Sequence, residues 1–306
     1  MTWTPPSDLS GTRVVITGAT GGLGHHVAAA LATRGAEVLM TVRDADRGAT
    51  LLERLRSLAP YARLHLVEAD LADLASLERA ARQLRDSTPS IDVVVNNAGI
   101  MLAPNVPTAD GFPLQLGTNH LGHFAWTAHL FRHLSPTGRV VTVSSVAAAR
   151  ARRVDLDALA ARRTAGRDRR WRAYAESKLA NLLFARELDR RLSASSSGRS
   201  SVAAHPGLAA TEITQTGMSM GHPVLGRLLT LAIRPGLQSA VAGAQPILRA
   251  ALDPTLASGD YVGPSWPGHT RGRPVPVTMP RRADDPDLAE RLWSVSEDAA
   301  GLRFEV

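Results

Sequence analysis

Tyr174 and Lys178 are the residues of this chain whose types and spacing best suit proton transfer. They stand four positions apart in a segment with helical periodicity, so their side chains share one face of the predicted helix. A free tyrosine has a pKa of about 10 and is a poor base at neutral pH. A neighbouring ammonium favours the phenolate and lowers the tyrosine pKa. The pair therefore predicts an acid–base group, with Tyr174 as proton donor or acceptor and Lys178 as its assistant.

Lys178 is also the single lysine of the chain, whereas every other basic residue is an arginine. A compositional drift toward arginine removes lysine wherever any cation will serve. A site that keeps its lysine needs chemistry that a guanidinium cannot copy, because an ammonium is compact and differently hydrated. A helical Tyr-x-x-x-Lys pair is usually a surface pair, but the isolated lysine and the rarity of tyrosine, three in the chain, favour the chemical interpretation.

Two further polar residues are candidates for the same site. Ser145 follows a predicted strand over residues 139–144, at the edge of the sheet where open α/β folds bind ligands. Its hydroxyl could hold a carbonyl or alcohol oxygen. Ser144 is its neighbour, and periodicity cannot distinguish the two. Asn119 is a helix-disfavouring amide within a helical stretch, where it is either a neutral surface choice or the anchor of a water molecule.

A glycine-rich turn follows the first predicted strand. Gly18, Gly22 and Gly24 have the spacing Gly-x-x-x-Gly-x-Gly, between a strand and a helix. Glycine lets the backbone approach a pyrophosphate closely, and the helix that follows presents unpaired N–H groups to that anion. Glycines alone are weak evidence, but this placement near the N-terminus predicts a dinucleotide site.

The end of the second predicted strand favours NADP(H) over NAD. NAD enzymes commonly place a carboxylate there for the ribose 2′-hydroxyl. Here Arg43 offers a planar, permanently charged group that suits a 2′-phosphate. The alternatives are that Arg43 is one more surface arginine, or that the adjacent Asp44 binds the ribose.

Apolar strands alternate with helical segments along the chain. Predicted strands cover residues 13–17, 36–42, 62–68, 91–96, 139–144 and 201–205. Predicted helices cover residues 23–34, 46–58, 73–86, 111–134, 171–192 and 285–299. This alternation predicts an α/β fold, a Rossmann-type doubly wound parallel sheet with helices on both faces. We expect a single domain over residues 1–306, with residues 211–252 as a lid region on the substrate side.

Composition excludes several classes of function. The chain has a net charge of +7 and a pI near 10.9, but its arginines are dispersed and only residues 150–172 form a dense cluster, which argues against nucleic-acid binding. The absence of cysteine excludes disulfides and thiolate metal sites. Neither a signal peptide nor an apolar run of about 20 residues is present, so we expect a soluble, cytoplasmic protein without a membrane span.

Four histidines at 120, 123, 129 and 133 have spacings that could suit a metal ion. No acidic ligand lies near them in the sequence, so we expect no bound metal.

In its motifs the chain resembles the short-chain dehydrogenase/reductase family and, within it, the retinol-dehydrogenase-like group. The resemblance covers roughly residues 10–305. The matching segments are NNAG at 96–99, NHLGHF at 119–124, SKLAN at 177–181, HPG at 205–207 and RLW at 291–293. It implies a catalytic tetrad of Asn119, Ser145, Tyr174 and Lys178, with Ser145 rather than Ser144 as the serine.

The resemblance also implies how a bound NADP(H) would be contacted. Lys178 would bind the nicotinamide ribose, residues 206 and 207 with Thr211 would border the nicotinamide, and Asn119 could hold a water that relays protons from Lys178. The implied cofactor-binding set is Gly18, Thr20, Gly22, Leu23, Gly24, Arg43, Asp70, Leu71, Asn97, Ala98, Gly99, Tyr174, Lys178, Pro206, Gly207 and Thr211. The substrate would be a small-molecule carbonyl or alcohol, and the reaction that of a ketoreductase or its reverse.

The sequence leaves four questions open. The chain could be a non-catalytic dinucleotide sensor, although a sensor does not need the intact tetrad. It could instead reduce a bulky or carrier-bound intermediate, with the arginines of 150–172 receiving an acidic carrier, although a solvated loop is the simpler interpretation. Met101, Leu102, Met218 and Met220 could line an apolar pocket or fill the core. A homodimer is a candidate assembly.

Overall fold

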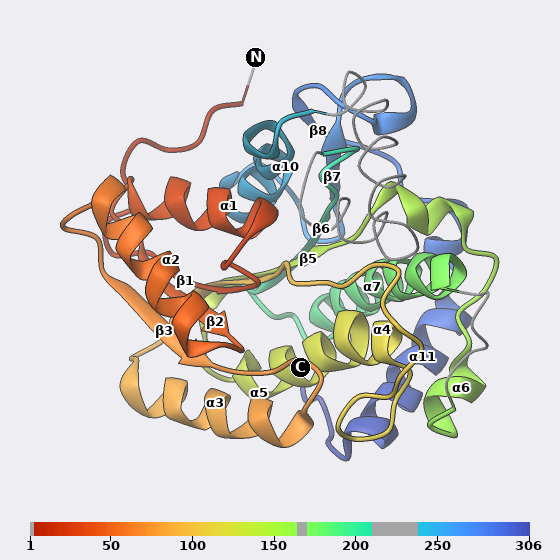
Figure 1. The fold of residues 1–306 in the computed structure, drawn as a ribbon. Helices are drawn as coiled ribbons and strands as arrows, with labels where there is room; N and C mark the ends of the chain where they lie inside the picture. The colour runs from red at the N-terminus through yellow and green to blue at the C-terminus, as the bar shows by residue number, and fades with distance from the viewer. Residues whose placement is uncertain (1–2, 164–169, 210–237) are drawn as a thin grey trace, which may run out of the picture.

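β-branched runs such as RVVIT and IDVVVN form the inner strands of a central sheet, because such residues suit strands that are covered on both faces. The computed structural model describes residues 3–163, 170–209 and 238–306. In this part of the chain, eight strands form one sheet in the order β3-β2-β1-β4-β5-β6-β7-β8 (Figure 1). The strands are β1 Arg13–Thr17, β2 Glu37–Val42, β3 Leu64–Glu68, β4 Ile91–Asn96, β5 Leu134–Val143, β6 Ser200–Ala204, β7 Tyr261–Pro264 and β8 Pro274–Pro276.

All neighbouring strands are parallel except β8, which pairs antiparallel with β7 at the sheet edge. The described helices are α1 Gly22–Ala32, α2 Ala45–Leu58, α3 Leu74–Ser87, α4 Leu114–Leu116, α5 Gly122–Phe131, α6 Leu156–Ala160, α7 Arg170–Ala194, α10 Ala240–Leu252 and α11 Pro286–Ala300. A π-helical turn, η1 Gly117–Leu121, joins α4 to α5, and 3₁₀ turns occur at Val146–Arg150, Pro267–His269 and Arg281–Asp284. The predicted Rossmann-type sheet is confirmed.

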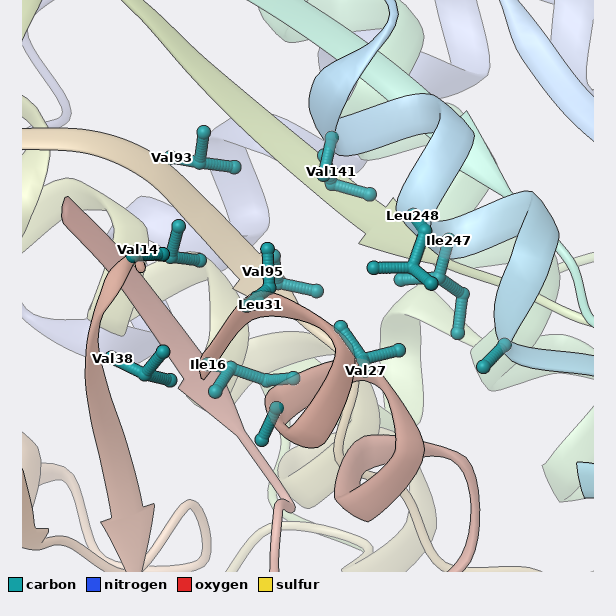
Figure 2. Packing of buried hydrophobic residues seen from close by; sticks show 14 of the residues in the cluster. Val14, Ile16, Val27, Leu31, Val38, Val93, Val95, Val141, Ile247 and Leu248 are labelled. Atoms are coloured by element: carbon teal, nitrogen blue, oxygen red, sulfur yellow. The ribbon is translucent and has the colours of Figure 1, made fainter. Parts of the chain in front are cut away.

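Alternate residues of each strand face opposite layers of helices. Val14 and Ile16 of β1 pack in the cluster under α1, α2 and α10, which Figure 2 shows from close by. Val15 of the same strand packs in a second cluster with residues of α3, α5 and α7. Because the side chains of a strand alternate between faces, this five-residue strand is buried on both sides.

The strand order reverses its direction between β1 and β4. From β1 the chain proceeds outward through β2 to β3, and it then returns to β4 on the other side of β1. Val15 is thus paired with Leu39 of β2 on one side and with Val94 of β4 on the other. The connections that leave β1 and β4 diverge to opposite sides, and the carboxyl ends of strands at such a reversal are where open α/β sheets bind ligands.

Two predicted elements differ in the structure. The helix expected over residues 111–134 begins at Leu114, contains the π-turn and ends at Phe131. The strand expected at 139 begins at Leu134, with an irregular register opposite Ile91 to Val93. Pro136 and Gly138 make residues 134–138 unlike a strand in the sequence, and the π-turn lies within a continuous helical stretch that has no sequence signal for it.

The C-terminal third holds two strands that the sequence did not predict. β7 and β8 are four and three residues long and contain Gly263, Pro264, Pro274 and Pro276. Proline cannot donate to a ladder, so such segments do not resemble strands in a sequence. They form here because β7 pairs with β6 and completes the parallel sheet. None of the helices in the described ranges is long and apolar enough to cross a membrane.

The predicted lid over residues 211–252 is wrong for its C-terminal part. α10 covers the sheet beside α1, and its Ala244, Ile247 and Leu248 are buried in the core (Figure 2). A helix that is buried in this way cannot open over a substrate. The segment 210–237 lies outside the described residues, so the lid prediction concerns that segment alone.

α11 forms as predicted and covers the outer side of α5 and α7. Its Trp293 stacks on Phe184 of α7 at 5.8 Å and meets Phe124 of α5 edge-on at 5.1 Å. Arg191 of α7 lies over the same indole at 4.3 Å. This aromatic cluster joins α11 to α5 and α7.

Trp293→Ala should lower the free energy of unfolding by about 3–5 kcal/mol, because it leaves a large cavity among packed rings. Urea denaturation measures the change. Tyr61→Ala is the control, since Tyr61 is 99% exposed, and it should change the stability by about 0.5 kcal/mol or less. An equal effect of the two substitutions would show that α11 does not stabilise the fold.

Candidate active site

The four predicted catalytic residues come from three elements that meet at the carboxyl ends of β4 and β5. Tyr174 and Lys178 lie on α7, Ser145 follows β5, and Asn119 lies in the π-turn η1. A Cβ on Gly99, just after β4, would lie 3.2 Å from the Lys178 Nζ and 3.4 Å from the Asn119 Oδ1. The fold therefore brings all four residues to one edge of the sheet.

The structure distinguishes the two adjacent serines. The half-buried Ser145 hydrogen-bonds the side chain of Tyr174 and also caps the following 3₁₀ turn through the backbone N–H of Ala147. Ser144 is 2% exposed, and its Oγ donates to the backbone oxygen of Lys178 at 2.7 Å. The side chain of Ser144 also hydrogen-bonds the side chain of Tyr261. Ser145 is thus the serine beside the candidate acid, while Ser144 joins β5 to α7.

Lys178 is buried, with 4% of its surface exposed, and its ammonium donates to the backbone oxygen of Val143 at 3.2 Å. The Nζ lies 6.0 Å from the ring centroid of Tyr174. Within the described residues no carboxylate pairs with this ammonium. Burial lowers the pKa of Lys178 to about 8, because the charged form loses its hydration.

The expected lowering of the Tyr174 pKa is not found. Burial raises the pKa of Tyr174, because a phenolate would lose its hydration there, and the hydrogen bond with Ser145 opposes this only in part. A neighbouring ammonium by itself would lower the Tyr174 pKa, but the sequence does not show the burial that raises it. A protonated Tyr174 is the form of a proton donor.

Asn119 holds the chain after β4 in place with its whole side chain. Its Oδ1 accepts from the Ile100 N–H at 2.8 Å, and its Nδ2 donates to the Ile100 oxygen and to the Ser177 Oγ, each at 2.9 Å. Both amide hydrogens are therefore used. A water on this side chain could only donate to the Oδ1, so the expected water relay stays a prediction.

The glycine-rich turn approaches the end of β4 closely. Gly18 has a φ of +73°, and a Cβ there would lie 2.8 Å from the Cα of Ala98. A Cβ on Gly24 would lie 2.2 Å from the Gly18 oxygen and 2.6 Å from the Asn97 Nδ2. Any larger residue at Gly18 or Gly24 would push β1, α1 and β4 apart.

The turn fits the pyrophosphate of a dinucleotide. α1 begins at Gly22 with no side-chain cap and no acidic residue in its first turn, so its leading N–H groups are left for an anion. Thr20, Gly22 and Leu23 lie at this start and are half-buried. The positive end of the helix dipole favours a phosphate at the same place.

Arg43 and Asp44, at the end of β2, differ in their interactions. Asp44 caps α2, accepting from the Arg47 N–H at 3.0 Å. Arg43 is exposed and makes no ion pair with any residue that the structure describes. The carboxylate is therefore occupied locally, and the guanidinium is the group available to a 2′-phosphate.

The remaining predicted cofactor residues lie along the same edge. Asp70 follows β3 and accepts from the Ala72 N–H at 2.9 Å, and the Leu71 oxygen lies 2.3 Å from where a Cβ of Gly122 would stand. Gly207, after β6, has a φ of +67° and its N–H donates to the His205 Nδ1 at 3.2 Å. The Pro206 oxygen accepts from Gln238. Thr211, Met218 and Met220 lie outside the described residues.

Sequence reasoning missed several side chains that hold this site together. The Thr17 hydroxyl accepts from the N–H groups of Asn97 and Ala98, both at 2.9 Å. Asn181 donates to the same Val143 oxygen as Lys178, at 3.1 Å. The sequence assigned His123 no role beyond a candidate metal ligand, and in the described ranges no cluster of three or more His, Cys, Asp or Glu residues could hold a metal. His123 and Asn181 lie inside the matching segments 119–124 and 177–181, and Thr17 precedes the glycine-rich turn, so these positions were the available signal.

Comparisons with known proteins agree with this geometry. The family model for short chain dehydrogenases matches residues 12–155. Human retinol dehydrogenase 12 is 36% identical over 304 residues, which cover 97% of this chain and 89% of that protein. Human retinol dehydrogenase 13 is 33% identical over 308 residues, covering 96% of this chain and 86% of that protein.

Solved structures of similar proteins share the fold. An uncharacterized protein from Mycobacterium paratuberculosis has a TM-score of 0.79 and 39% identity over 100% of both chains. A short chain dehydrogenase from Burkholderia cenocepacia, solved in complex with NADP, has a TM-score of 0.63 and 25% identity over 83% of this chain and 96% of that one.

The buried Lys178 should make stability depend on pH in the cofactor-free protein. Below pH 8 the lysine is protonated in both states; between about 8 and its ordinary 10.5 the unfolded chain binds more protons. The free energy of unfolding, relative to Lys178→Met, should therefore rise by about 2 kcal/mol from pH 8 to pH 9.5. Urea denaturation at both pH values measures it. Parallel pH dependence of the two proteins would contradict the burial of an unpaired ammonium.

Proposed function

The chain belongs to the short-chain dehydrogenase family, within the group of the retinol dehydrogenases, and we propose that it transfers a hydride between NADP(H) and a carbonyl or alcohol carbon. The observation that carries the proposal is the buried Lys178 ammonium, 6.0 Å from the ring centroid of Tyr174, with Ser145 beside that tyrosine at the edge of the sheet that carries the glycine-rich turn. A binding protein without catalysis would have no use for this combination.

Each residue has a distinct task in the proposed reduction. The bound nicotinamide supplies the hydride, which no side chain can do. The hydroxyls of Ser145 and Tyr174 donate hydrogen bonds to the substrate oxygen and hold it. As negative charge develops on that oxygen, the Tyr174 proton moves to it, and the phenolate left behind lies beside the Lys178 ammonium. In alcohol oxidation the same proton moves in the opposite direction.

The raised pKa of Tyr174 has a consequence for each direction of the reaction. Burial keeps Tyr174 protonated at neutral pH, so reduction finds its acid ready, whereas oxidation must first form the phenolate. The hydrogen bond with Ser145 and the Lys178 ammonium would favour that phenolate, as would a bound oxidised nicotinamide. The same side chain serves both directions, so the direction of net turnover depends on the concentrations of substrate and nucleotide.

Two observations support NADP(H) as the cofactor. Arg43 is exposed at the end of β2, while Asp44 is engaged as a helix cap. Two solved relatives at 25% identity, the Burkholderia cenocepacia enzyme and a blue fluorescent protein from a metagenomic library, were crystallised with NADP and NADPH. A guanidinium can bind two oxygens of a 2′-phosphate at once, and NADH lacks this phosphate.

We propose a bulky, apolar carbonyl compound as the substrate. The curated relatives are named for retinol, an apolar alcohol. Met101, partly buried, packs against the apolar cluster that includes Tyr174. A cytoplasmic location and a homodimer remain predictions.

Tyr174→Phe should abolish turnover and leave NADPH binding within about threefold, because it removes the proton and little else. NADPH oxidation with a panel of aldehydes and ketones, including retinal, measures turnover, and NADPH fluorescence measures binding. Unchanged activity of the variant would overturn the assignment. A protein that binds NADPH but reduces nothing in the panel would be a sensor, and one that reduces only a carrier-bound ketone would be a tailoring enzyme.

Ser145→Ala and Ser144→Ala form a matched pair of substitutions. Ser145→Ala should lower kcat by about 100-fold, since it removes one hydrogen bond to the reacting oxygen. It also removes the cap of the 3₁₀ turn, so the free energy of unfolding should fall by about 1 kcal/mol. Ser144→Ala should lower the free energy of unfolding by about 1 kcal/mol and affect kcat far less. If the two effects on kcat are exchanged, the assignment of Ser145 is wrong.

Arg43→Ala should raise the Kd for NADPH about 10-fold or more and leave the Kd for NADH within about twofold, because only NADPH has the 2′-phosphate. Fluorescence titration with both nucleotides measures the difference. Arg56→Ala is the control, since Arg56 is an exposed arginine in the last turn of α2. Equal losses for NADPH and NADH would exclude Arg43 as the phosphate ligand.

A further inference from the structure

His123 is a fully buried imidazole that the proposed chemistry does not use. It lies in the first turn of α5, with 1% of its surface exposed. Its Nδ1 is 2.9 Å from the backbone oxygen of Asn119, and its Nε2 is 2.8 Å from the Thr17 Oγ1. The ring therefore spans from the turn that carries a predicted catalytic residue to the residue before the glycine-rich turn.

The partners determine which nitrogen carries the proton. A backbone oxygen can only accept, so the Nδ1 of His123 is the protonated nitrogen. The Thr17 hydroxyl already accepts two N–H groups, from Asn97 and Ala98, and has one hydrogen left to donate. That hydrogen goes to the Nε2 at 2.8 Å in preference to the Val95 oxygen at 3.4 Å. All the hydrogen-bonding groups of Thr17 and His123 are then satisfied by a neutral ring.

A charged ring would break this arrangement. A second proton on the Nε2 of His123 would leave the Thr17 hydroxyl facing three donors. Burial lowers the pKa of His123 to about 4, the bond to the Asn119 oxygen works against this, and the nearby Lys178 ammonium lowers it further. The ring thus stays neutral at physiological pH and adds no second cation beside Lys178.

We propose that His123 is a positioning residue for the dinucleotide. It uses the Asn119 oxygen as a fixed anchor and holds the Thr17 hydroxyl, and Thr17 in turn aligns the backbone amides of Asn97 and Ala98 against the glycine-rich turn. A side chain of α5 thus positions the backbone of Asn97 and Ala98, which lies against the glycine-rich turn. The inference depends on the proposed dinucleotide site, although not on the identity of the substrate.

His120 supplies a matched control from the same motif. It is also 1% exposed, and its Nε2 lies 2.8 Å from the Ser296 Oγ of α11, on the side away from the glycine-rich turn. The Ser296 hydroxyl donates to the Leu292 oxygen, so His120 carries its proton on the Nε2. His120 and His123 thus have opposite tautomers. His123 bonds Thr17, before the glycine-rich turn, and His120 bonds Ser296 of α11.

Isosteric amides can separate the two bonds of His123. An asparagine reaches the position of the Nδ1 and keeps the bond to the Asn119 oxygen, but it leaves the Thr17 hydroxyl with only the Val95 oxygen, at 3.4 Å, as an acceptor. A glutamine reaches the position of the Nε2 and can accept from Thr17. His123→Asn should therefore raise the Kd for NADPH about 10-fold, because the Thr17 hydroxyl loses its short buried hydrogen bond, whereas His123→Gln should stay within about threefold of the wild type.

The experiment measures NADPH binding by fluorescence and thermal unfolding for both variants and for His120→Asn. His120→Asn should lower Tm about as much as His123→Asn does, with the NADPH Kd within about twofold of the wild type. ¹⁵N NMR of the imidazoles at pH 7 should show a protonated Nδ1 in the signal that His123→Asn removes, and a protonated Nε2 in the signal that His120→Asn removes.

Two outcomes would overturn the inference. Either His123→Asn and His120→Asn have the same effect on the NADPH Kd, or the imidazole signal of His123 shows a protonated Nε2. A wild-type protein that fails to bind NADPH would instead refute the proposed function, so the two failures are distinguishable.

Discussion

The buried ammonium of Lys178 constrains every group around it. Its hydrogen bond goes to the Val143 oxygen, and in the described ranges no carboxylate balances its charge. Burying an unpaired cation lowers the stability of the fold. Such a cation is therefore typical of sites where the charge has a function. Its neighbours are accordingly neutral and hydrogen-bonded: Ser144 to the backbone of α7, Asn119 through its whole side chain, and His123 as an uncharged ring.

The site is built from two halves that backbone packing brings together. One half is the glycine-rich turn after β1, and the other is the group of side chains from α7, η1 and the end of β5. The residues after β4 join them: Ala98 leaves no room for a Cβ at Gly18, and Gly99 lies against Lys178 and Asn119. The proposed hydride and proton transfers need both halves at once, since a cofactor on one side must meet an acid on the other.

Prediction succeeded where local pattern and final structure agree. The inner strands, the glycine-rich turn and the helix of Tyr174 and Lys178 have strong periodicity or spacing, and they form as expected. Prediction failed where a neighbouring strand or helix determines the structure that a segment adopts. β8, with prolines at both ends, is a strand only because β7 lies beside it, and α10 is core rather than lid because α1 packs on it. The Tyr174 pKa was predicted in the wrong direction for the same reason, since burial is a property of the fold.

By itself the sequence determined the fold class, the glycine-rich turn after the first strand and the shared helix face of Tyr174 and Lys178, because each depends on residues that are close together in the chain. Only the tertiary structure decided which of two adjacent serines faces Tyr174, where Asn119 directs its amide, and that His123 links the Asn119 turn to Thr17. These contacts join residues up to 106 positions apart, and no local spacing encodes a hydrogen bond that the packing of separate strands and helices creates.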